Sequence, residues 1–83
     1  MDKIIVNFSD GTSKTFHEGQ IVIPWKKSGK NVSTAEPYTL WVHPDYELIP
    51  SFMEMLVNCD FFYELETPKI CYASNSVVKV EVI

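Results

Sequence analysis

Apolar and polar residues alternate over several short segments of the chain, and this alternation predicts β-strands with one buried face. In 3–8 the apolar positions are Ile4, Val6 and Phe8, and the Asp10-Gly11 pair that follows is typical of a hairpin turn. Similar patterns predict further strands at 12–16, 20–25, 38–43, 61–65, 69–73 and 77–83. These segments predict a chain built mainly from strands.

One segment has the apolar spacing of a helix instead. Within 51–59 the apolar residues follow the i, i+3, i+4, i+7 pattern of a single helix face: Phe52, Met55, Leu56 and Cys59. Pro50 suits the first helical position, where its missing amide hydrogen is not needed. A helix this short is not stable alone, so we expect these four side chains to dock on the sheet. The polar stretch 26–35 is expected to be a mobile loop.

The predicted order is β-β-β-β-α-β-β-β, with short connections that favour antiparallel neighbours. We therefore predict an α+β fold in which a curled antiparallel sheet of about six to seven strands is covered by one short helix. A chain of 83 residues, 46% of them hydrophobic, can close one core, so 1–83 is expected to form a single domain. The sequence suggests neither a membrane span nor a signal peptide, so we expect a cytoplasmic location.

Charge is distributed unevenly along the chain. The segment 31–68 has no lysine or arginine, and its acids are Glu36, Asp45, Glu47, Glu54, Asp60, Glu64 and Glu66. A surface that serves only solubility usually mixes both signs, so this acidic segment predicts contact with a basic partner. The chain contains no arginine, which argues against direct binding to nucleic acid.

Several residues are expected to form the contact surface. Glu54 lies off the apolar helix stripe, and Glu64 and Glu66 occupy the strand face opposite Phe61, so all three acids should reach solvent. Acids on either side of the helix extend this surface, and two aromatic residues lie opposite the other large apolar residues of their strands. The candidate partner-binding residues are therefore Asp45, Glu47, Glu54, Asp60, Glu64, Glu66, Trp41 and Phe62.

The chain carries no motif for catalysis, metal binding or cofactor binding. A nucleophile would need a positioned base, and the two histidines, His17 and His43, adjoin no nucleophile motif. Cys59 and Cys71 form no CxxC pair, so they are expected to be buried, reduced and structural. A zinc site from these four residues would have no local ligand pair to begin it. We expect a non-enzymatic protein without cofactor or metal.

The segments Ile5-Val6-Asn7-Phe8-Ser9-Asp10-Gly11-Thr12 and Tyr72-Ala73-Ser74-Asn75-Ser76-Val77-Val78 resemble small accessory proteins of phages and mobile elements of low-GC Gram-positive bacteria. The resemblance covers about a quarter of the chain. It implies an inhibitor of host defence, with anti-CRISPR proteins among the examples, acting in the host cytoplasm.

The expected function is therefore inhibition or modulation of a larger protein, one that handles nucleic acid, by an acidic surface that mimics nucleic acid. Two alternatives stay open. The chain could bind a small molecule and sequester a nucleotide signal, although the lack of arginine counts against this. It could also form a structural oligomer, including a homodimer, because exposed sheet edges pair readily with identical chains.

Overall fold

Strands and one α-helix build two separate antiparallel sheets in the computed structural model, which describes residues 2–83. The strands are β1 (Lys3–Phe8), β2 (Ser13–His17), β3 (Ile21–Ser28), β4 (Asn31–Thr34), β5 (Tyr38–Thr39), β6 (Phe61–Glu64), β7 (Tyr72–Ala73) and β8 (Val77–Val82). The helix is α1 (Ile49–Val57), and a short 3₁₀ turn, η1 (Ser74–Ser76), leads into β8. The predicted α+β class is confirmed.

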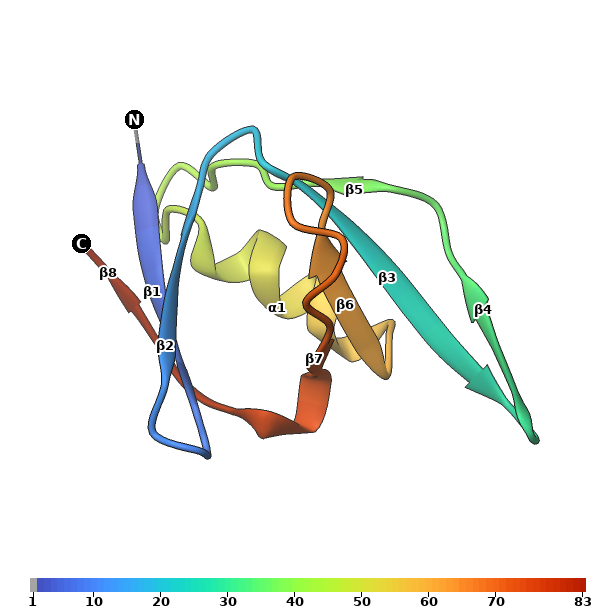
Figure 1. The fold of residues 1–83 in the computed structure, drawn as a ribbon. Coiled ribbons are helices and arrows are strands. Elements are labelled where there is room, and N and C mark those ends of the chain that lie inside the picture. The colour runs from blue at the N-terminus through green and yellow to red at the C-terminus, as the bar shows by residue number, and fades with distance from the viewer. Residues whose placement is uncertain (1) are drawn as a thin grey trace.

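The two sheets stand on either side of α1 (Figure 1). The first sheet has the order β2-β1-β8, and the second has the order β4-β3-β6-β7, with β5 also paired to β3. All the pairings are antiparallel, as the short connections predict. The prediction of one curled sheet is corrected to two sheets that enclose a helix.

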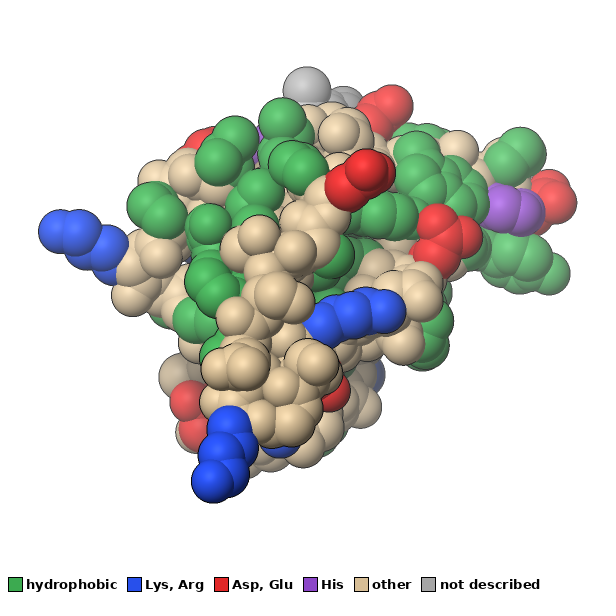
Figure 2. All heavy atoms as spheres, turned by 90° about the vertical axis from the view of Figure 1, so that its right-hand side faces the viewer, with side chains coloured by type: hydrophobic (Ala, Val, Ile, Leu, Met, Phe, Trp, Pro, Cys, Tyr) green, Lys and Arg blue, Asp and Glu red, His purple; other side chains and the backbone are tan. Residues whose placement is uncertain are grey.

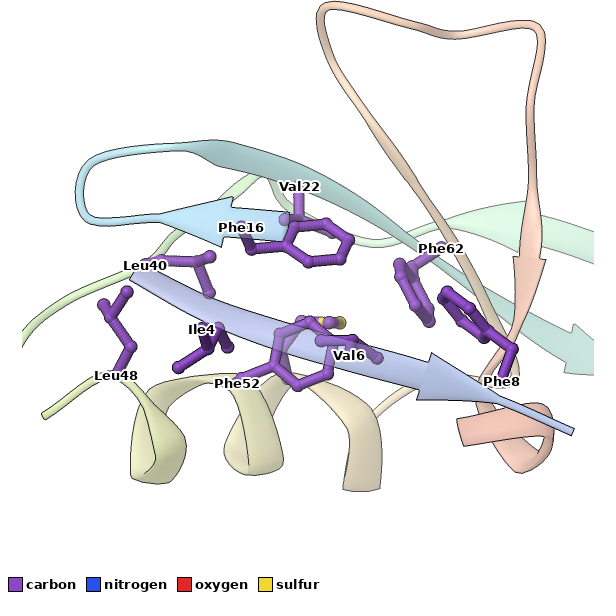
Figure 3. Close-up of a cluster of buried hydrophobic side chains, with 10 residues drawn as sticks. Ile4, Val6, Phe8, Phe16, Val22, Leu40, Leu48, Phe52 and Phe62 are labelled. Carbon is purple, nitrogen blue, oxygen red and sulfur yellow. The ribbon is translucent and has the colours of Figure 1, made fainter. Parts of the chain in front are cut away.

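The core lies where both sheets meet the helix. The alternating residues Ile4, Val6 and Phe8 of β1 are buried, as their spacing predicts. Side chains from both sheets converge on Phe52 of α1 (Figure 3). The remaining buried hydrophobic residues in this cluster are Phe16, Val22, Leu40, Leu48, Met55 and Phe62.

The stretch 26–35, expected to be a mobile loop, is instead largely a β-hairpin. Lys26, Lys27 and Ser28 extend β3 and pair with β4. Gly29 has a positive φ of 61°, a conformation that glycine adopts without steric cost, and it allows the chain to reverse. Polar residues suffice here because the hairpin arm is solvent-exposed and needs backbone pairing rather than a buried face.

Pro24 sits inside β3, although proline usually marks an edge strand or a strand end. The partner on one side of β3 changes at this point: β5 pairs with Ile21 and Val22, and β4 begins opposite Trp25. The Pro24 carbonyl accepts a hydrogen bond on that same side, from the Ala35 amide at 2.9 Å. The missing amide hydrogen therefore falls at the break between β5 and β4, where no ladder bond is lost.

Helix α1 begins and ends two residues earlier than predicted, with Pro50 in its first turn. Of the four docking residues predicted, Phe52 and Met55 are buried, whereas Leu56 and Cys59 are only partly buried at the edge of the core. Ser51 is the other buried helix residue. The docking face is thus turned slightly from the predicted stripe.

We expect Phe52→Ala to lower the free energy of unfolding by about 3–5 kcal/mol, because it leaves a cavity between the two sheets. Urea unfolding monitored by circular dichroism measures this loss. The control is Met53→Ala on the exposed side of the same helix, which should change stability by less than about 0.5 kcal/mol. Equal effects of the two substitutions would show that the helix docks through another face.

Candidate functional site

A hydrogen-bonded chain of three side chains joins β5 to the exposed side of α1. The indole Nε1 of Trp41 donates to the Tyr38 hydroxyl at 2.8 Å, and that hydroxyl donates to Glu54 Oε1 at 2.7 Å. Burial, together with the hydrogen bond to the Glu54 carboxylate, raises the pKa of the Tyr38 phenol. These hydrogen bonds bring together Trp41 and Glu54, two predicted site residues that are thirteen positions apart in the sequence.

The backbone of Trp41 is also held in place. Its amide donates to the buried Ser51 Oγ at 3.2 Å, and Ser51 in turn donates to the Leu48 carbonyl within the first turn of α1. Nevertheless 39% of Trp41 remains exposed. Trp41 is therefore held by hydrogen bonds at both its backbone amide and its ring nitrogen, while part of the residue faces solvent.

A closed loop, 43–47, lies next to this indole. The amides and carbonyls of His43 and Glu47 exchange two hydrogen bonds, of 2.7 and 3.1 Å. His43 Nδ1 accepts from the amides of Asp45 and Tyr46. Glu47 adopts a φ of 60°, an uncommon value for a residue with a side chain, which the closed loop maintains.

The loop presents aromatic and acidic groups beside Trp41. The His43 ring lies 6.3 Å from Trp41 and 5.3 Å from Tyr46, measured between centroids, and Tyr46 is 66% exposed. Asp45 and Glu47 are also exposed. We call Tyr38, Trp41, His43, Asp45, Tyr46, Glu47 and Glu54 the Trp41 surface.

The other predicted acids that face solvent are not part of the Trp41 surface. Asp60 lies beyond the C-terminal end of α1, where its Oδ2 accepts from the Lys27 amide at 2.7 Å. Glu66 is exposed in the turn that follows β6. The carboxylates therefore do not gather into one patch.

Two predicted surface residues are buried. Phe62 has no exposed surface, and Glu64 is only 3% exposed. Phe62 packs against Phe16 and Phe52, with ring centroids 6.3 and 5.9 Å apart. The expectation that Phe62 and Glu64 reach solvent was wrong.

The error has a physical cause. The segment 61–65 has large apolar residues on both of its faces, so alternation alone does not show which face is inward. The inward face is the one that holds Phe62, and Glu64 follows it inward by the period of two. Lys14 Nζ of β2 lies 3.6 Å from Glu64 Oε1, beyond hydrogen-bond distance, and its counter-charge offsets part of the cost of burying the carboxylate.

The opposite face of the second sheet is consequently apolar as well. Trp25 and Tyr63 pack there with ring centroids 6.3 Å apart, while Val32 and Leu65 are about half exposed. Figure 2 shows hydrophobic side chains spread over this side of the molecule. Acidic groups on the face drawn form separate patches among them, and lysine side chains share the same face.

The structure offers no centre for metal chemistry within residues 2–83, since no three His, Cys, Asp or Glu side chains there are grouped closely enough to hold an ion. In the same range, no helix is long and apolar enough to cross a membrane. Cys59 is partly buried, and its Sγ lies 3.2 Å from Ser74 Oγ, whereas Cys71 is exposed. The expectation that both thiols are buried is therefore corrected for Cys71.

We expect Glu64→Lys to destabilise the protein by roughly 3 kcal/mol, because it places a second cation beside Lys14 in a buried position. Glu66→Lys makes the same charge change in an exposed turn and should alter stability by less than about 0.5 kcal/mol. Urea unfolding at neutral pH compares the two variants. Similar stabilities would contradict the burial of Glu64.

The two thiols should differ in their reaction with iodoacetamide. Burial is the main cause that raises the pKa of Cys59, so less of it is thiolate at neutral pH. We expect Cys71→Ser, which retains Cys59, to react more slowly than Cys59→Ser, with the gap narrowing as pH rises. Equal rates at neutral pH would show that Cys59 is accessible and unperturbed.

No protein-family model matches the chain, and comparisons with curated proteins and with solved structures find no match. The candidate site is therefore defined by its geometry alone. That geometry is an exposed, hydrogen-bonded aromatic surface with carboxylates at its margin.

Proposed function

We propose that the chain is a non-enzymatic binding protein that inhibits or modulates a larger, nucleic-acid-handling protein through the Trp41 surface. The observation that carries the proposal is the hydrogen-bonded chain from Trp41 through Tyr38 to Glu54. It holds an exposed indole and an exposed carboxylate in one fixed arrangement before any partner arrives. A surface already ordered in this way loses less conformational entropy on binding.

The chemistry of this surface favours a protein partner with basic groups. Tryptophan and tyrosine are enriched among the residues that dominate protein interfaces, because they bury a large area with few rotatable bonds. Asp45, Glu47 and Glu54 add negative charge beside the two exposed aromatic rings. Arginine or lysine side chains could pair with these carboxylates and also stack on the rings.

A basic surface of this kind is typical of proteins that grip nucleic acid. Occupying it with carboxylates would block the nucleic acid, which fits the anti-defence role implied by the resemblance to phage accessory proteins. The proposed negative surface is narrower than the acidic segment 31–68, because Glu64 is buried and Asp60 bonds the Lys27 backbone.

The test is affinity capture from lysates of low-GC Gram-positive bacteria, followed by binding kinetics with the captured protein. We expect the unaltered chain to retain a nucleic-acid-handling protein. Trp41→Ala and Glu54→Lys should each weaken its binding by at least about tenfold, the loss of a central interface residue. Raised salt should slow association, because steering by opposite charges is screened.

The matched control is Glu66→Lys, which makes the same charge change as Glu54→Lys in the exposed turn after β6, outside the Trp41 surface. It should bind as tightly as the unaltered chain. If Trp41→Ala and Glu54→Lys both fold and bind normally, the Trp41 surface is not the contact.

A further inference from the structure

Strand β8 forms an edge of the first sheet, with β1 on one side and no strand on the other within residues 2–83. Edge strands of natural proteins are usually shortened, covered or otherwise protected, because their free backbone groups pair with other strands. Here the edge carries exposed apolar residues: Val78 is 65% exposed and Val82 is 42% exposed. Lys79, Glu81 and the register shift beside Phe8 protect this edge against unlike strands, so a strand that pairs with it must have complementary charges.

The register shows which backbone groups are free. The Ile83 amide donates to the Lys3 carbonyl at 3.1 Å, and Ile4 faces Val82. Because bonded and non-bonded pairs alternate in an antiparallel ladder, Val80 and Val82 direct their N–H and C=O groups away from β1. Val80 therefore offers one donor and one acceptor at the middle of the free edge.

The charges of β8 are complementary to a second copy of the same strand. We propose that two copies of the chain pair through β8, antiparallel, about a twofold axis at Val80. Val80 then faces Val80 of the other copy and exchanges two hydrogen bonds with it. Lys79 of each copy faces Glu81 of the other, so both pairs of charges are opposite in sign.

The existing contacts already order these charges. Lys79 Nζ lies 3.2 Å from Glu81 Oε1 within β8, and Asn7 Nδ2 of β1 donates to the same Glu81 oxygen at 3.3 Å. Pairing would place the two Lys79 and two Glu81 side chains in an alternating ring on one face of a continuous six-stranded sheet. An isologous contact of this kind closes at two copies and leaves no β8 edge for further growth.

The apolar residues of the edge gain a partner in the same arrangement. Val82 of one copy lies near Val78 of the other at each end of the pairing, where the regular register ends because the ladder of β8 with β1 shifts between Asn7 and Phe8. Val82 also lines a groove of about 540 Å³ with Ile49, Pro50 and three residues of the Trp41 surface, Asp45, Tyr46 and Glu47. The groove provides an apolar surface next to the position that Val78 of the second copy would occupy.

Sedimentation equilibrium of charge variants in β8 tests the pairing while every residue of the Trp41 surface is left unchanged. The unaltered chain should show a concentration-dependent monomer–dimer equilibrium. In a dimer of Lys79→Glu chains, or of Glu81→Lys chains, residues 79 and 81 of facing strands carry like charges at both positions where they meet. Each substitution should therefore weaken the dimer by at least about tenfold. An equimolar mixture of these two variants restores both opposite-sign pairs between chains and should form a heterodimer.

The mixture distinguishes weakened pairing from damaged folding. Each variant chain keeps like charges at 79 and 81 in the mixture, so a fold damaged by those charges would not be restored by mixing. Circular dichroism confirms that both variants fold, since the altered side chains are exposed. A second readout is hydrogen exchange at the Val80 amide, which should slow as protein concentration rises. The proposal is overturned if the unaltered chain stays monomeric, if either variant dimerises as tightly, or if mixing restores nothing.

Discussion

The fold depends on three phenylalanine rings that meet between the two sheets. Phe16 comes from the first sheet, Phe62 from the second and Phe52 from the helix, and none of them is exposed. The Phe52 ring lies 5.1 Å from Phe16 and meets Phe62 edge-on at 5.9 Å. Since the two sheets share no strand, this aromatic contact is a principal link between them. The helix is held by the same contact, and with it the Ser51 hydroxyl that positions Trp41.

Local periodicity was enough to predict much of this architecture. The strand 3–8 was located correctly and the helix to within two residues, because each has one clearly apolar face and one polar face. The strand 61–65 was placed correctly but turned the wrong way, because Phe61 and Tyr63 compete with Phe62 for the inward face. Only packing against Phe16 and Phe52 decides between them, and that information is not local.

Local periodicity also predicted part of the candidate site. Exposure of Glu54 followed from the helix stripe. Trp41 is exposed as predicted, but the strand 38–43 on which that prediction rested is wrong, because only Tyr38–Thr39 forms a strand, β5. The hydrogen-bonded connection of Trp41 and Glu54 through Tyr38 could not be predicted from the sequence, because it needs the tertiary arrangement of β5 against α1. Charge behaves similarly: the acidic segment has no lysine in the sequence, but the fold brings Lys14 Nζ to Glu64 and occupies the Asp60 carboxylate with the Lys27 backbone amide.

The break in the ladder at Pro24 divides β3 into two parts with different environments. Before Pro24 the strand is held by β5 and β6 and carries the buried Val22, whereas from Lys26 onward it is exposed and pairs with β4. The arm formed by Lys26–Ser28 and β4 can therefore open in solution without exposing any core side chain. Local fluctuations of this arm cost only a few backbone hydrogen bonds. Its tip at Gly29 is thus the natural position to insert a peptide tag or a fluorophore, since strain there would not spread to the three phenylalanine rings.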